Sequence, residues 1–164
     1  MTAEIEIIEA QLSGFETIQN LAYEIWPSYY ANIISLDQIE YMLRLLYSEE
    51  ALIEQTQKGQ RFFSVVSKEQ AVGFIGLTLH GDRRLKIDKL YLIEDCRGKG
   101  FGKKLITFIE NEAKKLNVKS LFLNVNRFNE SLLFYKKAGF EIIETKDIPF
   151  GPFWLNDFIL SKSI

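Results

Sequence analysis

The sequence has few of the residues that build disulfide frameworks and metal centres. Its 164 residues include one cysteine, Cys96, and one histidine, His80. A single cysteine cannot form an internal disulfide, and one histidine with one cysteine falls short of the ligand sets of zinc and related metals. Cys96 also has no histidine near it in the sequence, which argues against a cysteine nucleophile. The chain is therefore expected to be cytoplasmic and to hold no metal.

Long apolar runs and an excess of one charge are also missing. We find no run of 18 apolar residues and no pattern of a cleavable signal peptide, so no membrane association is expected. The formal net charge of −2 argues against general binding to nucleic acid, because such binding neutralises many phosphates. With 47% hydrophobic and 13% aromatic residues, residues 1–164 are predicted to form a single domain with one core.

Hydrophobic periodicity predicts an alternation of strands and helices. Strands are expected over residues 4–9, 61–67, 71–80, 84–93, 120–126, 140–145 and 153–160. Helices are expected over residues 15–26, 36–46, 48–59, 101–116 and 129–139, the first ending before Pro27 and the second following a capping box at Ser35 and Gln38. Residues 84–126 read as a strand, helix and strand, so the two strands are expected to be parallel with a right-handed crossover. Gly73 and Gly76 inside a strand mark a bulge or a close approach of backbones.

A glycine-rich turn leads from the strand 84–93 into the helix 101–116. Gly98, Gly100 and Gly102 can adopt positive φ and let a ligand approach the main chain, while the first N–H groups of the helix favour an anion. Lysines in a first helical turn oppose the helix dipole by roughly 0.3–1 kcal/mol each, so a bound pyrophosphate is the simplest partner for them. The spacing fits neither a Walker loop nor the Gly-x-Gly-x-x-Gly fingerprint. A plain glycine turn with solvated lysines is the alternative.

Two stretches resemble one known family. Residues 97–102, Arg-Gly-Lys-Gly-Phe-Gly, resemble the Arg/Gln-x-x-Gly-x-Gly/Ala signature of GNAT-superfamily N-acetyltransferases, and residues 129–140 resemble a second pattern of that family. The resemblance covers roughly residues 87–140. It implies an α/β (α+β) fold with a mixed, mostly antiparallel, splayed sheet of about seven strands flanked by helices on both faces, and acetyl-CoA as co-substrate. The residues that it assigns to coenzyme binding are Leu90, Tyr91, Leu92, Arg97, Gly98, Lys99, Gly100, Phe101, Gly102, Lys103, Asn129 and Tyr135.

The resemblance further implies direct transfer of an acetyl group to a primary amine in a ternary complex, with backbone groups at Leu90 and Leu92 holding the acetyl carbonyl and the pantetheine arm. An alkylamine with a pKa near 10.4 is almost wholly protonated at pH 7, so the reaction needs a base. Asp88, in phase with Leu90 along the strand, is the candidate base, although a strand-edge pair with Lys86 or Arg84 explains it equally well. Tyr135 is the candidate acid for the departing thiolate, because a tyrosine hydroxyl is protonated at neutral pH.

The acceptor is the least defined part of this interpretation. Residues 25–46 are similar to bacterial polyamine acetyltransferases, which favours a small cationic amine. Trp26, Tyr29 and Tyr30 fit either packing or a substrate entrance. A group of acidic residues fits either a solvated helix face or an acidic mouth that attracts the amine; it comprises Asp37, Glu40, Glu49, Glu50 and Glu54.

Two alternatives to a small amine acceptor stay open. One is a protein or peptide N-acetyltransferase with the same fold, and the other is a coenzyme A-binding module without turnover. The final strand, residues 153–160, is free to pair within the domain or across a homodimer.

Overall fold

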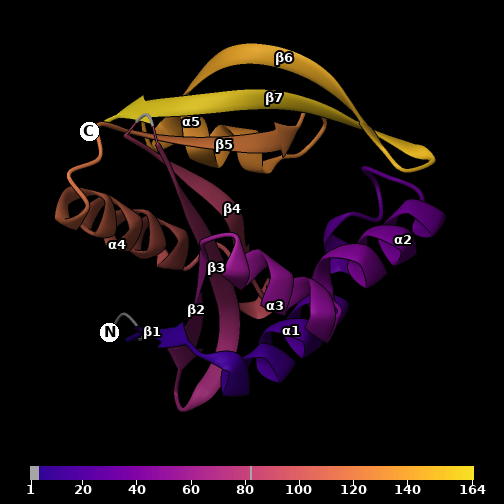
Figure 1. Ribbon diagram of the computed structural model, residues 1–164, viewed down its shortest axis with the longest axis horizontal. Helices are drawn as coiled ribbons and strands as arrows, with labels where there is room; N and C mark the ends of the chain where they lie inside the picture. Colours follow the sequence, from indigo (N-terminus) through magenta and orange to yellow (C-terminus); the bar gives the residue numbers. More distant parts are fainter. Residues whose placement is uncertain (1–3, 82) are drawn as a thin grey trace. The chain divides into compact units, whose positions relative to one another are not determined.

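The computed structural model describes residues 4–81 and 83–164 and arranges their strands in one seven-stranded sheet of order β1-β2-β3-β4-β5-β7-β6 (Figure 1). The strands are β1 (Glu6–Ala10), β2 (Gln60–Ser67), β3 (Gln70–His80), β4 (Arg84–Leu92), β5 (Ser120–Asn126), β6 (Glu141–Phe150) and β7 (Phe153–Ser163). The α-helices are α1 (Phe15–Tyr29), α2 (Leu36–Tyr47), α3 (Glu49–Gln57), α4 (Phe101–Lys115) and α5 (Ser131–Lys137). The predicted α/β class is confirmed. In this described part of the chain, no helix is long and apolar enough to cross a membrane.

Both kinds of strand pairing occur in this sheet. β4 and β5 are parallel, with Arg84–Lys86 in register with Ser120–Phe122, which confirms the predicted strand, helix and strand unit. The pairs β1 with β2, β2 with β3, β5 with β7, and β6 with β7 are antiparallel. β7 has a partner on either side, so the final strand pairs within the chain rather than across a dimer.

The described residues form two compact units, and β4 passes from one into the other between Asp88 and Lys89. The first unit holds the residues up to Thr78 together with Lys89–Gly102. Its helices α2 and α3 begin at serine caps, where Ser35 Oγ accepts the Gln38 N–H at 3.1 Å and Ser48 Oγ accepts the Ala51 N–H at 3.1 Å. Side chains that are at most 1% exposed form its core; they include Ile18, Ile39, Leu52, Phe62, Phe74 and Leu77.

Helix α1 runs through Pro27 and ends at Tyr29, so the prediction that it stops before the proline is wrong. A proline inside a helix removes one backbone hydrogen bond and costs about 3 kcal/mol. The last turn compensates by packing aromatic rings, because Tyr29 and Tyr30 both contact the ring of Tyr91. The N–H of Tyr30 closes the turn on the Trp26 carbonyl at 2.9 Å.

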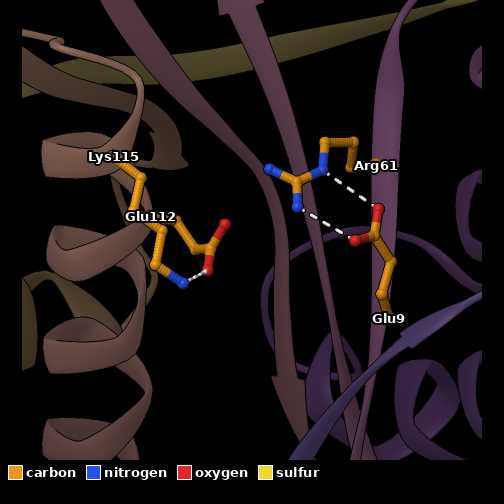
Figure 2. A network of polar contacts seen from close by, with 4 residues as sticks. All are labelled: Glu9, Arg61, Glu112 and Lys115. Atoms are coloured by element: carbon orange, nitrogen blue, oxygen red, sulfur yellow. Dashed lines mark hydrogen bonds and ion pairs between the residues drawn. The ribbon is translucent and has the colours of Figure 1, made fainter.

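An ion pair fastens the edge strand β1 to β2. The guanidinium of Arg61 donates two hydrogen bonds to Glu9, at 3.0 and 2.9 Å (Figure 2). These bonds lower the pKa of the Glu9 carboxyl. Such forked pairs fix geometry as well as charge, so this one helps to hold the register at the start of the sheet.

The second unit comprises Leu79–Asp88 and Lys103–Ile164. The long hairpin of β6 and β7 dominates it (Figure 1). Lys162 on β7 donates to the carbonyl of Ala138 at 2.7 Å, which satisfies the C-terminal end of α5. It also reaches Glu110 on α4 at 3.3 Å. On the same helix, the buried Glu112 pairs with Lys115 at 3.0 Å (Figure 2).

Strand β6 is longer than the sequence predicts. The predicted strand ends at residue 145, whereas β6 continues through Asp147–Phe150, and Pro149 lies in register with Trp154. β6 is the last strand of the sheet. An edge strand tolerates proline because the missing N–H is on the side without a neighbouring strand.

Gly73 lets β3 approach the end of β4 closely. A Cβ at this position would overlap the carbonyl oxygen of Tyr91 and would lie 2.8 Å from Leu92 Cδ2. The register of β2 with β3 also shifts beside Gly73. Both features expected of an interior strand glycine are therefore present.

We predict that Gly73→Ala destabilises the protein by about 1–3 kcal/mol, because backbone atoms cannot move aside as flexible side chains do. Thermal unfolding measures this effect, and about 1 kcal/mol corresponds to a shift of roughly 2–4 °C for a chain of this length. Gly81→Ala is the matched control, since a Cβ there meets nothing within 4 Å. Equal melting temperatures for the two variants would contradict the prediction.

Candidate functional site

The turn after β4 has the backbone conformation that the glycine pattern predicts. A short 3₁₀ helix, Glu94–Cys96, follows β4. The chain then passes through Arg97 in an extended conformation to Gly98, with φ +73°, and Gly100, with φ +81°. A Cβ at either glycine would meet nothing within 4 Å. These glycines are thus required by their backbone angles, and the space beside them is open. α4 begins at once, at Phe101.

Several cationic residues lie at or beside the start of α4 in the sequence. Lys99 lies in the turn, and Lys103 and Lys104 lie in the first turn of the helix. Arg97 instead folds back, since its Nε donates to the Leu92 carbonyl at 3.2 Å and its guanidinium lies 4.9 Å from the centre of the Tyr29 ring. An anion at the helix start would therefore meet lysine ammonium groups and backbone N–H groups.

An aromatic cluster joins the end of α1 to β4. The hydroxyls of Tyr30 and Tyr91 lie 2.7 Å apart, and the Tyr91 ring also contacts Trp26, Tyr29 and Phe74. Burial raises the pKa of the Tyr30 hydroxyl well above its usual value, and the neighbouring Tyr91 adds to the shift. Trp26 is 3% exposed, so the packing interpretation holds for it. Tyr29 and Tyr30 are partly exposed.

Lys89, between the predicted base and the predicted acetyl-binding strand, is a buried cation that the sequence analysis did not single out. Its side chain has 7% exposure, and its Nζ donates to Gln55 Oε1 at 2.7 Å and to Gln60 Oε1 at 2.6 Å. The same Nζ lies 5.1 Å from the centre of the Phe62 ring. The sequence signal that could have revealed this burial is the two-residue period of the strand, which puts Lys89 on the same face as the buried Ile87.

Asp88 lies on the opposite face of β4 from Lys89. Its Oδ1 is 4.0 Å from the Nζ of Lys86, and its side chain is 17% exposed. Arg84 is turned instead onto the ring of Phe122, 4.4 Å from its centre. The interpretation of Asp88 as a strand-edge charge beside Lys86 is therefore supported by a contact, and the 4.0 Å distance makes this contact a loose one.

Asn129 lies two residues before α5, and Tyr135 lies within this helix. Asn129 is 8% exposed, and its Oδ1 accepts the N–H of Ser131, two residues on, at 2.9 Å, as in an Asx turn. Tyr135 is 8% exposed and packs its ring against Phe134 and Phe140. The positive φ of Gly139, +98°, ends the segment as predicted.

The predicted site residues are divided between the two units. Those in the first unit are Leu90, Tyr91, Leu92, Arg97, Gly98, Lys99, Gly100, Phe101 and Gly102. Those in the second unit are Asp88, Lys103, Asn129 and Tyr135. All the acidic residues that the sequence offered as an acidic mouth are exposed, and one of them, Glu54, pairs with Lys58 at 2.7 Å. This favours the solvated helix face.

Comparisons with known proteins identify the family. The model of the acetyltransferase (GNAT) family matches residues 17–140. Spermidine N(1)-acetyltransferase of Thermoplasma acidophilum is 30% identical over 164 residues, which cover 96% of this chain and 96% of that protein.

Solved structures agree. PaiA N-acetyltransferase from Thermoplasma acidophilum, in complex with coenzyme A, has a TM-score of 0.85 at 30% identity and covers 98% of this chain and 99% of its own. A GCN5-related N-acetyltransferase from Rhodopseudomonas palustris has a TM-score of 0.83 at 20% identity, covering 100% of this chain and 97% of its own, and so supports the fold. The chain therefore belongs to the GNAT family of acetyl-CoA-dependent N-acetyltransferases.

Proposed function

We propose that this enzyme transfers the acetyl group of acetyl-CoA to a primary amine of a small cationic acceptor, of the polyamine class, by direct attack in a ternary complex. The main structural support for acetyl-CoA binding is the turn at Gly98 and Gly100, where both glycines have positive φ and the space beside them is open. The relative that acts on spermidine and the similar structure that holds coenzyme A support the two substrates.

The residues of this turn fit a pyrophosphate. The N–H groups at the start of α4 have no partner within the helix, and the helix dipole is positive there. Lys99 and Lys103 add charge that a polyphosphate neutralises. In our proposal Arg97 to Lys103 and Asn129 bind the coenzyme, while the backbone of Leu90 to Leu92 holds its acyl arm and supplies the N–H donors that stabilise an oxyanion.

The proton transfers are assigned to two side chains. The acceptor arrives as an ammonium ion, and Asp88, directly or through water, removes the proton that blocks attack. After attack the nitrogen still carries one proton too many; Tyr135 donates its own proton to the departing thiolate and is reprotonated by the one that the nitrogen releases. The thioester supplies an acyl group that is ready for transfer, so no covalent intermediate with Cys96, whose side chain is buried, is required.

The experiment that tests this function is calorimetric titration with acetyl-CoA, followed by thiol release in the presence of spermidine, simple monoamines and a short peptide. We expect a dissociation constant of about 1 μM, which corresponds to roughly −8 kcal/mol, and release that depends on spermidine. Release with the peptide alone would favour a protein or peptide acceptor. Binding without release would favour a non-catalytic module, and absence of binding would overturn the coenzyme site.

We predict that Gly100→Ala weakens coenzyme A binding at least about tenfold, because a methyl group enters the space through which the ligand reaches the backbone. Gly59→Ala is the matched control. Gly59 also has a positive φ, +100°, and its Cβ would also meet nothing within 4 Å. Both variants should lose about 1–2 kcal/mol of stability from the same backbone strain. Equal coenzyme affinity in the two variants would remove Gly100 from the binding site.

We predict that Tyr135→Phe lowers kcat by about 10²-fold, the lower end of the range for a general acid. The coenzyme dissociation constant should be unchanged, because only a proton donor is lost. Tyr23→Phe, on an exposed part of α1, serves as the control. An unchanged kcat would exclude Tyr135 from the mechanism.

A further inference from the structure

Asp157, on β7, is a buried carboxylate that the mechanism above does not use. It is 7% exposed. Within residues 4–81 and 83–164, its carboxylate accepts one side-chain hydrogen bond, from Asn124 Nδ2 at 3.4 Å. An ionised carboxylate has about four acceptor positions, so one long bond leaves most of its capacity unused.

The two cations whose charges lower the pKa of Asp157 are already paired with other carboxylates. Burial raises the pKa of Asp157, and the Asn124 bond and the charges of Arg127 and Lys86 lower it in part. Arg127 Nη2 lies 2.6 Å from Asp147 Oδ1, and Lys86 Nζ lies 4.0 Å from Asp88 Oδ1. Among the described side chains, Asp157 has no ion pair of its own. A buried carboxylate of this kind is stabilised by a cation with its own hydrogen-bond donors.

The strand register places Asp157 on the same face of the sheet as Asp88. Asp157 is paired with Asn126 on β5, and Lys86 on β4 is paired with Phe122 on β5. Paired residues share a face and alternate residues return to it, so Asp88, Asn124 and Asp157 all lie on one face. The exposed Lys146 of β6 lies opposite Asp157 in the strand register and so is on this face as well.

β5 lies between β4 and β7, so these two strands lie two strand spacings, about 10 Å, apart where β4 and β5 are paired, at Arg84–Lys86. Asp88 follows this paired stretch by two residues, so about 10 Å is a lower bound for the separation of the two carboxylates. A chain of a few methylene groups that joins two ammonium groups fits such a separation, whereas a monoamine reaches one carboxylate at a time.

We propose that Asp157 is a specificity-determining residue that binds a second, non-reacting ammonium group of the acceptor, while Asp88 serves the reacting amine. This inference rests on the proposed function and deepens it, because it selects diamines and polyamines over monoamines. The ammonium donates hydrogen bonds to the unused positions of the carboxylate, and the Asn124 amide orients that carboxylate.

The test compares spermidine with n-propylamine and n-butylamine, the monoamines that carry its two end groups. Asp157→Asn should lower kcat/KM for spermidine at least about tenfold, as expected for a hydrogen bond to a charged group. It should change kcat/KM for the two monoamines less than about threefold, and coenzyme A affinity should be unchanged. Glu141→Gln, an exposed carboxylate of the same hairpin, is the control and should leave all three amines unaffected.

The outcomes separate this inference from the function on which it rests. Thiol release by the wild-type enzyme with none of the amines overturns the proposed function. Release with spermidine but equal losses for all three amines in Asp157→Asn, or no loss at all, overturns the role of Asp157 alone. The wild-type enzyme gives an independent test that needs no variant: a ratio of kcat/KM for spermidine to that for n-butylamine near one also overturns it.

Discussion

The buried face of strand β4 carries a cation, Lys89. Several contacts in the first unit serve to satisfy this buried ammonium group. Lys89 could not be buried alone, because an isolated ammonium in an apolar interior is very costly. Gln55 at the end of α3 and Gln60 at the start of β2 supply two oxygens within 2.7 Å of its Nζ. The network thereby ties α3 and β2, about 30 residues earlier in the sequence, to the strand that leads into the glycine turn.

The turn itself depends on backbone geometry more than on side chains. Positive φ at Gly98 and Gly100 aims the main chain into the start of α4, and other residues adopt such angles only at a cost of about 1–2 kcal/mol. Arg97 turns away, onto the Leu92 carbonyl and the Tyr29 ring. The Arg97 side chain therefore connects the glycine turn with the end of α1, where the tyrosine cluster lies. The glycine turn and the aromatic cluster are thus linked by this one side chain.

Membership of the family does not identify the acceptor, since acceptor choice depends on individual side chains rather than on the fold. The acidic residues of α2 and α3, which the sequence offered as an amine-attracting mouth, are exposed and belong to a solvated face. The carboxylate that is buried and poorly paired is Asp157, 69 residues after Asp88 in the sequence. Sequence reasoning passed over it because nothing local in Asn156 and Asp157 distinguishes a buried carboxylate from a loop contact.

Local chemistry explains what the sequence by itself determined. The serine caps of α2 and α3, the positive φ of Gly139, the parallel pairing across α4 and the family signature at Arg97 to Gly102 all depend on residues that are neighbours in the chain. Tertiary structure decided the rest. α1 continues through Pro27 because Tyr91, more than 60 residues later, packs against its last turn, and Pro149 joins β6 because that strand has only one neighbour. Burial of Lys89 and Asp157 likewise depends on partners from distant strands and helices. Hydrogen bonding and burial between distant segments are properties of the folded chain, and no pattern of adjacent residues encodes them.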